Sequence, residues 1–241
     1  MELATYIPLT LLCILSVLLA CRRAFVSFPW FFAYVLFAVV ADIARFYVHS
    51  RPQPYFLIYW STESGYALLG IGVMYEVYRS VVGHLGRAGW PRLLFPFLSL
   101  VSVLLTAGCA TAWPASELST RIMILVLLEI AVRFLEVLMF ASLVTLVLAL
   151  GLQWRQYAFG IATGFGVYST VALLTTTRFF LLGRGYFFFW AWALIVSYSS
   201  AVLIWLWFFS GTERPGSPGG IALPSLEELN MYRRLIRRIN R

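Results

Sequence analysis

Seven apolar segments dominate this sequence and limit what the chain can fold into. They cover approximately residues 4–21, 28–48, 54–78, 93–113, 121–150, 156–182 and 186–210. An α-helix needs about 20 predominantly apolar residues to cross the ~30 Å hydrocarbon core of a bilayer. The chain is 61% apolar and 12% charged, whereas soluble domains average about 45–50% and about 25%. We therefore expect an all-α integral membrane protein, with a seven-transmembrane-helix bundle over residues 1–210.

The placement of arginine predicts the orientation of this bundle. The sequence has no lysine, and cytoplasmic loops carry most basic residues of membrane proteins. One set of alternate loops holds Arg22, Arg23, Arg79, Arg87, Arg92 and Arg155. The other set holds Arg51 and Arg184, with Arg121 at a segment edge. We expect a multi-pass protein of the inner (plasma) membrane, with its amino terminus outside and its carboxyl terminus in the cytoplasm. The first segment lacks the preceding basic residues of a secretory signal, so we expect it to be retained.

The carboxyl-terminal part divides into a linker and a basic segment. Residues 211–224 are rich in Gly and Pro and predict a flexible linker. Residues 225–241 predict an amphipathic helix whose arginines share one face: Arg233, Arg234, Arg237, Arg238 and Arg241. We expect this helix to lie on anionic lipid head groups at the cytoplasmic surface. Docking on a membrane-protein partner or on a second copy of the chain is the alternative. Orientation and tail explain the net charge of +8, so no nucleic acid is expected.

Charged residues within the apolar segments are the strongest indication of a site. An ionisable group at the bilayer centre costs about 2.5–3.5 kcal/mol and usually faces the bundle interior. Glu129, Arg133 and Glu136 are spaced i, i+4, i+7 on one helix face, so Arg133 can bridge both carboxylates. Glu63 lies in a polar stretch of the third segment beside Tyr66, at a depth from which it can approach this cluster. These five residues form the predicted ligand-binding or proton-binding site.

Three further charges suggest structural ion pairs. Asp42 and Arg45 lie three residues apart in the second segment, at a depth similar to that of Arg178 in the sixth. The deep acids outnumber the deep bases by one, so we expect one carboxyl group to hold a proton. We choose Glu63, because no basic residue lies within one turn of it. In the alternative interpretation, all these charges only fix the register between helices.

Residue types exclude several chemistries. Without lysine, a retinal Schiff base cannot form. The two histidines, His49 and His84, both lie in short connections, so they do not suit a haem or a three-histidine zinc site. The spacing of Cys13, Cys21 and Cys109 matches no metal or redox motif. We found no motif of a membrane protease. We therefore expect no enzyme, no metal and no cofactor.

Glycines recur in two of the segments. The third segment contains Gly65, Gly70 and Gly72, and the sixth contains Gly160, Gly164 and Gly166. Small residues let neighbouring helices approach closely in membranes. We expect close helix packing, and not a ligand contact, at these positions.

Four motifs connect the sequence with known proteins: Tyr59-Trp60-x-x-Glu63, Tyr75-Glu76-x-x-Arg79, the pair Glu129 and Arg133, and the stretch from Gly160 to Gly166 after Trp154. In these motifs the chain resembles small bacterial seven-helix membrane proteins without assigned function. It is also similar to the seven-helix sensory modules that precede signalling domains in some bacterial kinases. The resemblance implies a non-enzymatic sensory or binding module that responds to a small ligand or a proton.

Two other functions stay open. The stretch Asp42-Ile-Ala-Arg45-Phe46 is echoed by Glu129-Ile-Ala-Val-Arg133-Phe134, which suggests the inverted repeat of many secondary transporters. Such a transporter would couple to proton or cation movement through the same carboxylates. The third hypothesis is an accessory subunit of a membrane protein complex, in which the charges are purely structural.

Overall fold

The computed structural model describes residues 2–48, 51–82, 91–111, 120–150, 156–182 and 187–211. All regular secondary structure in these ranges is helical: α1 (Glu2–Cys21), α2 (Ala24–Ser27), α3 (Pro29–Val48), α4 (Pro52–Val82), α5 (Pro91–Thr111), α6 (Thr120–Leu150), α7 (Gln156–Leu182) and α8 (Phe187–Ser210). Every helix except α2 has 20 residues or more and coincides, within a few residues, with one apolar segment. The predicted all-α fold is confirmed.

Four of the described helices are long and apolar enough to cross a membrane. The qualifying stretches are Pro29–Val48, Leu93–Ala110, Tyr157–Thr175 and Phe189–Ser210, in α3, α5, α7 and α8. The 31-residue helices α4 and α6 have charged residues between their apolar ones. The chain is a multi-pass membrane protein.

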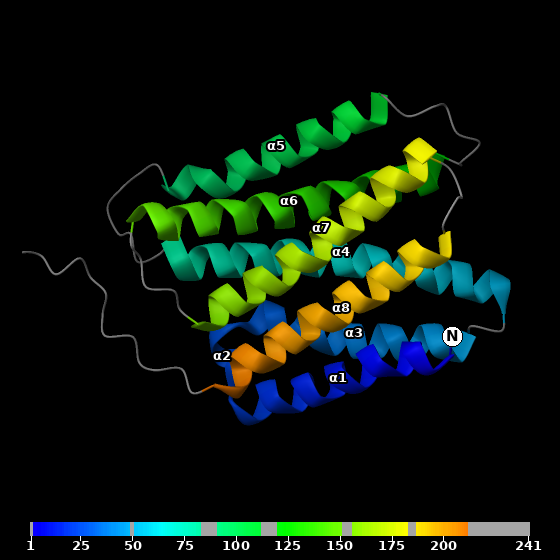
Figure 1. Cartoon of the computed structure of the whole chain (residues 1–241), viewed down its shortest axis with the longest axis horizontal. Helices are drawn as coiled ribbons and strands as arrows, with labels where there is room; N and C mark the ends of the chain where they lie inside the picture. Colours follow the sequence, from blue (N-terminus) through cyan, green and yellow to red (C-terminus); the bar gives the residue numbers. More distant parts are fainter. Residues whose placement is uncertain are drawn as a thin grey trace, which may run out of the picture.

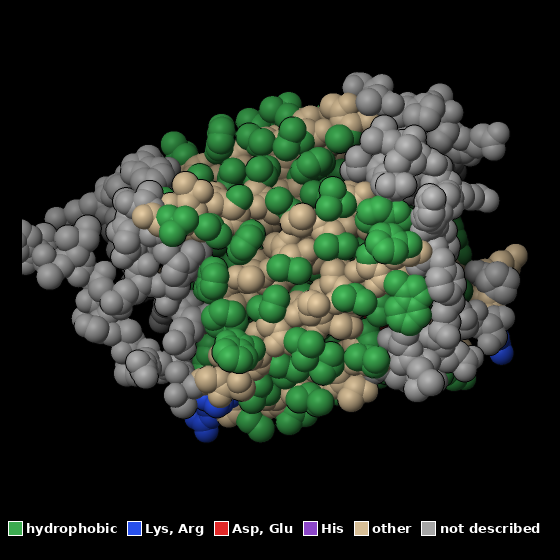
Figure 2. All heavy atoms as spheres, in the orientation of Figure 1, with side chains coloured by type: hydrophobic (Ala, Val, Ile, Leu, Met, Phe, Trp, Pro, Cys, Tyr) green, Lys and Arg blue, Asp and Glu red, His purple; other side chains and the backbone are tan. Residues whose placement is uncertain are grey.

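The outer surface of the bundle is apolar. Figure 2 shows hydrophobic side chains over most of the described face, with arginine side chains at its edges. Large apolar residues on five different helices are more than half exposed: Ile14, Val40, Leu68, Leu104 and Trp207. A soluble monomer rarely exposes so continuous an apolar surface. This exterior is suited to contact with lipid chains.

Six of the long helices form a closed ring. Around the ring, α3 packs against α4, α4 against α6, α6 against α7, α7 against α8, α8 against α1, and α1 against α3. The helix α4 also contacts α7 across the ring. Outside the ring, α5 lies along α6 at one edge of the molecule (Figure 1). The inner faces of α3, α4, α6 and α7 therefore meet in the middle of the bundle.

Aromatic side chains fill the part of the interior that lies between α3, α7 and α8. Phe31 packs edge-on against Trp205, with 5.2 Å between ring centroids, and stacks on Phe209 at 5.5 Å. Tyr34 meets the edge of Phe165 at 4.9 Å. All five side chains are almost completely buried. Their burial and interlocking ring contacts fix α3 against α7 and α8.

Five of the six glycines pack closely, as predicted, and they pack against aromatic rings of neighbouring helices. A Cβ atom added at Gly65 would lie 2.3 Å from Cζ of Phe37, and one added at Gly164 would lie 2.2 Å from Nε1 of Trp205. The same relationship joins Gly72 to Trp30, Gly160 to Phe208 and Gly166 to Phe140. Each glycine thus provides the space for a large ring from a neighbouring helix.

Prolines mark the start of several helices, and a residue of another helix caps one of them. Three helices, α3, α4 and α5, begin at a proline, whose fixed φ angle suits the first helical position. At the start of α3, the backbone N–H groups of Trp30 and Phe31 donate to the carboxylate of Glu76, at 3.2 and 3.0 Å. Glu76 belongs to α4, so one helix caps the free N–H groups of its neighbour.

The short helix α2 reverses the chain between α1 and α3, and the sequence patterns did not predict it. It follows Arg23, which adopts a left-handed conformation with φ 52°. The preceding Arg22 donates to the carbonyl oxygens of Ser210 and Gly211, at 2.7 and 3.2 Å. The hydroxyl of Tyr157 donates to the same Gly211 oxygen at 3.2 Å. These contacts join the ends of α1 and α8 and the start of α7.

Two predicted regions lie outside the described residues. The linker predicted over 211–224 is described only at Gly211, and the basic segment predicted over 225–241 is not described. The structure therefore does not test the five arginines of the predicted surface helix.

Candidate functional site

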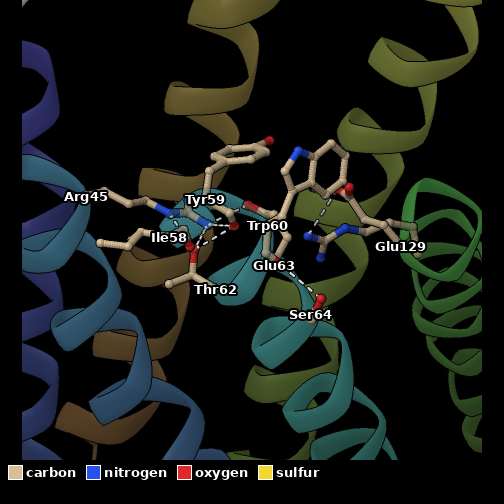
Figure 3. Close-up of polar contacts among 9 residues, drawn as sticks. Arg45, Ile58, Tyr59, Trp60, Thr62, Glu63, Ser64 and Glu129 are labelled. Atoms are coloured by element: carbon tan, nitrogen blue, oxygen red, sulfur yellow. Dashed lines mark hydrogen bonds and ion pairs between the residues drawn. The ribbon is translucent and has the colours of Figure 1, made fainter. Parts of the chain in front are cut away.

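The first polar cluster joins the end of α3 to α4. The Nη2 atom of Arg45 donates to Oε1 of Glu63 at 2.8 Å, and its Nε atom donates to Oγ1 of Thr62 at 2.8 Å. Nη2 also contacts the Thr62 hydroxyl and the carbonyl oxygen of Tyr59 (Figure 3). The guanidinium lies over the rings of Tyr59 and Tyr66, 4.9 and 5.5 Å from their centroids. Both charges of this pair are thus compensated within the bundle.

Asp42, Arg45 and Arg178 are predicted to form structural ion pairs. Among the described side chains, Arg45 pairs with Glu63 of α4, and no ion pair or hydrogen bond joins Arg45 to Asp42. Glu63 was chosen as the protonated carboxyl because its own helix offers no nearby base, yet Arg45 reaches it from α3. Spacing along one helix does not reveal a partner on another. The side chain of Arg178 lies outside the described ones.

The second cluster belongs mainly to α6. Its Arg133 bridges two carboxylates, as predicted, but unequally: Nη1 is 3.1 Å from Oε2 of Glu136, and Nη2 is 4.0 Å from Oε1 of Glu129. The hydroxyl of Ser169 in α7 also donates to Oε2 of Glu136. The guanidinium lies 4.6 Å from the ring centroid of Tyr168. Glu136 is therefore held by two donors, whereas Glu129 is only loosely paired.

Glu136 also rests directly against the backbone of α4. A Cβ atom added at Gly70 would lie 2.9 Å from Oε1 of Glu136 and 3.5 Å from Cγ1 of Val132. Gly70 thus lets α6 pack closely against α4, and the group that it makes room for is a carboxylate. With 1% of its side chain exposed, Glu136 is enclosed between α4, α6 and α7.

Two buried hydrogen-bond donors near this cluster have no partner among the described residues. They are Nε of Arg133 and the hydroxyl group of Tyr198 in α8. The ring of Tyr198 packs against that of Tyr168, with 5.4 Å between centroids. The guanidinium of Arg133 lies over the Tyr168 ring. A guanidinium has five N–H donors, and leaving them unpaired in a buried site is costly. The interior therefore offers donors to a small acceptor.

Electrostatic interactions connect the two clusters, although no hydrogen bond or ion pair joins them among the described residues. The ring of Tyr66 contacts that of Tyr34 at a tilt, with 5.5 Å between centroids, and Tyr34 lies within electrostatic range of Arg133 and Glu136. Glu129 likewise lies within electrostatic range of Glu63, and both side chains appear in the close-up of Figure 3. That Glu63 approaches the α6 cluster closely stays a prediction.

Several residues of this interior were not predicted. Thr62 lies in the polar stretch around Glu63, so its neighbourhood carried a signal. Ser169 gave none, because an isolated serine in an apolar helix usually bonds to its own backbone, and Tyr34 and Tyr168 gave none, because tyrosines are common in these apolar segments. Only the register between neighbouring helices brings Tyr168 to Arg133 and Ser169 to Glu136.

The described charges of the interior do not balance. Four acids face two arginines: Asp42, Glu63, Glu129 and Glu136 against Arg45 and Arg133. Each of these arginines has one carboxylate within about hydrogen-bonding distance, so Asp42 and Glu129 are in excess among the described side chains. An unpaired carboxylate is expensive to keep ionised in a medium without water. The excess acids are thus suited to bind a proton or another positive group.

Comparisons with protein-family models, with curated proteins and with solved structures found no match to this chain. The apolar helices and exterior place it among polytopic membrane proteins. What distinguishes it within that broad class is the charged interior between α3, α4, α6 and α7.

Proposed function

We propose that this protein is a non-enzymatic membrane module that binds a proton or small ligand at its buried Glu and Arg residues. The observation that carries the proposal is the unequal bridging of Arg133, 3.1 Å from Glu136 but 4.0 Å from Glu129. One carboxylate is fully engaged, whereas the other is available. The resemblance to seven-helix sensory modules supports the same function.

Binding at this site can alter helix packing, because its contacts join different helices. Arg45 and Glu63 connect α3 with α4, and Glu136 and Ser169 connect α6 with α7. Polar contacts between membrane helices contribute about 0.6–2 kcal/mol each. A ligand that changes one or two of them shifts a conformational equilibrium severalfold. The output then passes to a partner protein or to a second copy of the chain.

The topology belongs to the same proposal. All seven long helices cross the cell's inner (plasma) membrane, with the amino terminus outside and the carboxyl terminus in the cytoplasm. The apolar exterior of α1, α4 and α6 supports the crossings beyond the four that hydropathy identifies. The basic segment 225–241 then lies at the cytoplasmic surface on anionic lipid head groups.

The proposal is tested with Glu63→Gln and Arg133→Gln in the full chain. Each variant is scored for yield and thermal stability in detergent, and for its response to pH and to candidate ligands in lipid vesicles. We expect both variants to change the response, and Arg51→Gln, an exposed arginine before α4, to leave it unchanged. Loss of folding in both variants without a changed response in any folded fraction would assign the charges a purely structural role.

A secondary transporter is the second candidate. The excess carboxyl groups of Asp42 and Glu129 favour it, because proton-coupled transport needs acids that gain and lose protons. The Asp42–Arg45 and Glu129–Arg133 motifs would then mark two inverted halves. Proton flux into vesicles that contain the purified protein separates the two candidates, since only a transporter carries net flux.

A further inference from the structure

We infer that Glu129 is the group that takes up and releases the proton, while Glu136 stays paired with Arg133 in both states. The inference rests on the proposed function and narrows it to one ligand and one carboxyl group. It also differs from the prediction made from the sequence, in which Glu63 was the protonated acid.

The two carboxylates that flank Arg133 differ in every contact. Glu136 lies 3.1 Å from Nη1, accepts from Ser169, packs against Gly70 and has 1% of its side chain exposed. Glu129 lies 4.0 Å from Nη2, beyond hydrogen-bonding distance, and has 31% of its side chain exposed. Because the two carboxylates use different guanidinium nitrogens, Glu129 can change its state without disturbing Glu136.

Two arginines and two other carboxylates surround Glu129, so their charges balance without a charge on Glu129. The groups that interact with it electrostatically lie on its own helix α6 and on α3, α4 and α7: Arg45, Tyr59, Glu63, Arg133, Glu136 and Tyr168. The described side chains of α5, which packs on the outer side of α6, include no charged group. With Glu129 neutral, the four charges around it form two complete pairs, Arg45 with Glu63 and Arg133 with Glu136, and Asp42 remains as the one described interior acid outside these pairs.

Arg133 provides a second, independent indication of an exchangeable site. Its side chain is 9% exposed, and its buried Nε atom has no hydrogen-bond partner in the described part of the chain. Its Nη2 atom points to Glu129 with a gap of 4.0 Å. When Glu129 loses its proton, the carboxylate gains a charge-assisted hydrogen bond by closing this gap. When it regains the proton, it releases Nη2.

Position along α6 suggests how the proton arrives. Glu136 lies near the middle of the 31-residue helix, and Glu129 lies about 10 Å closer to its Thr120 end. In the proposed topology this end faces the outside.

A metal ion fits the site less well than a proton, because no three His, Cys, Asp or Glu side chains form a suitable group among the described residues.

The test is infrared difference spectroscopy of the full chain in lipid vesicles, titrated between neutral and acidic pH. A protonated carboxyl group gives a C=O stretching band that its carboxylate lacks. We expect such a band to grow on acidification, to disappear in Glu129→Gln and to persist in Asp42→Asn, the matched variant of the other excess acid. If Glu129→Gln fails to fold, Glu129→Asp replaces it, and we then expect the band to shift in frequency.

The outcomes separate the inference from the proposed function. A band unchanged by either substitution at Glu129, or lost in Asp42→Asn instead, overturns the inference and leaves the proposed function standing. Absence of any acid-induced carboxyl band in the unaltered chain also overturns the inference. The proposed function itself fails only if Glu63→Gln and Arg133→Gln leave the pH and ligand responses intact.

Discussion

Arg45 in α3 donates a hydrogen bond to Glu63 in α4 across 2.8 Å, although the two residues are 18 positions apart. Both side chains belong to apolar helices and would be costly to leave unpaired in lipid. Their pairing shows how the bundle accommodates charge: each described arginine of the interior has one close carboxylate. Among the described acids of the interior, Asp42 and Glu129 have no arginine within hydrogen-bonding distance. They are therefore the residues that bear most on function.

Loss of Arg133 should destabilise the protein strongly. In Arg133→Gln, the carboxylate of Glu136 stays buried with only Ser169 as a donor, and breaking a buried pair in this way costs about 3–5 kcal/mol. The double variant Arg133→Gln with Glu136→Gln should recover most of the loss. The measurement is the free energy of unfolding in detergent micelles. A single variant within about 0.5 kcal/mol of the parent would contradict this account of the pair.

Glycine substitutions should distinguish packed from open sites. In Gly164→Ala, the new methyl group would meet Trp205, a 1% exposed side chain that cannot easily move, so we expect a loss of about 1–3 kcal/mol. The matched control is Gly108→Ala in α5, where the added Cβ meets nothing within 4 Å. Because alanine favours helix, the control should be neutral or stabilising by up to about 1 kcal/mol. Equal melting temperatures for the two variants would refute the ring-on-glycine packing.

Removal of the distant helix cap should loosen the start of α3. In Glu76→Ala, the N–H groups of Trp30 and Phe31 lose their acceptor, and loss of a cap costs about 0.5–2 kcal/mol. Glu76→Gln keeps one acceptor oxygen, so its effect should be smaller. Hydrogen exchange of these two amides measures the change directly. Unchanged protection in Glu76→Ala would mean that the contact does not hold the helix end.

The proposed topology makes a prediction about labelling. Arg51 and Arg79 are both exposed, at opposite ends of α4. After the native cysteines are replaced, a membrane-impermeant maleimide should label Arg51→Cys in intact cells. It should label Arg79→Cys only after the membrane is permeabilised. The reverse pattern would invert the topology, and labelling of both in intact cells would exclude a crossing by α4.

The helices could be predicted from the sequence because each apolar segment carries its own signal. Bilayer thickness requires a long apolar run, and proline or glycine marks most of its ends. The exceptions have local causes. The helix α2 is only four residues long and depends on the left-handed conformation of Arg23, which no periodicity reveals. The helix α4 extends to Val82, beyond its predicted apolar segment, and includes polar residues such as Arg79. The end of an apolar segment therefore does not mark the end of this helix.

The site could be predicted only in part. The contacts of Arg133 with Glu129 and Glu136 follow from spacing within one helix, so they can be predicted from the sequence. The pairing of Arg45 with Glu63 depends on the register between two helices, which the packing of Phe37 on Gly65 helps to set. No pattern within one helix specifies such a register. For the same reason, spacing within the third segment could not show that Arg45 lies close to Glu63.

A charge exchange between Arg45 and Glu63 tests the central claim, that the charges of these helices meet inside the bundle, most directly. Unfolding free energies are measured for Arg45→Glu, for Glu63→Arg and for the double variant. We predict that each single variant is destabilised, because it places like charges together, and that the double variant recovers much of the loss. Losses that simply add, with no recovery in the double variant, would contradict an interior contact between the two side chains.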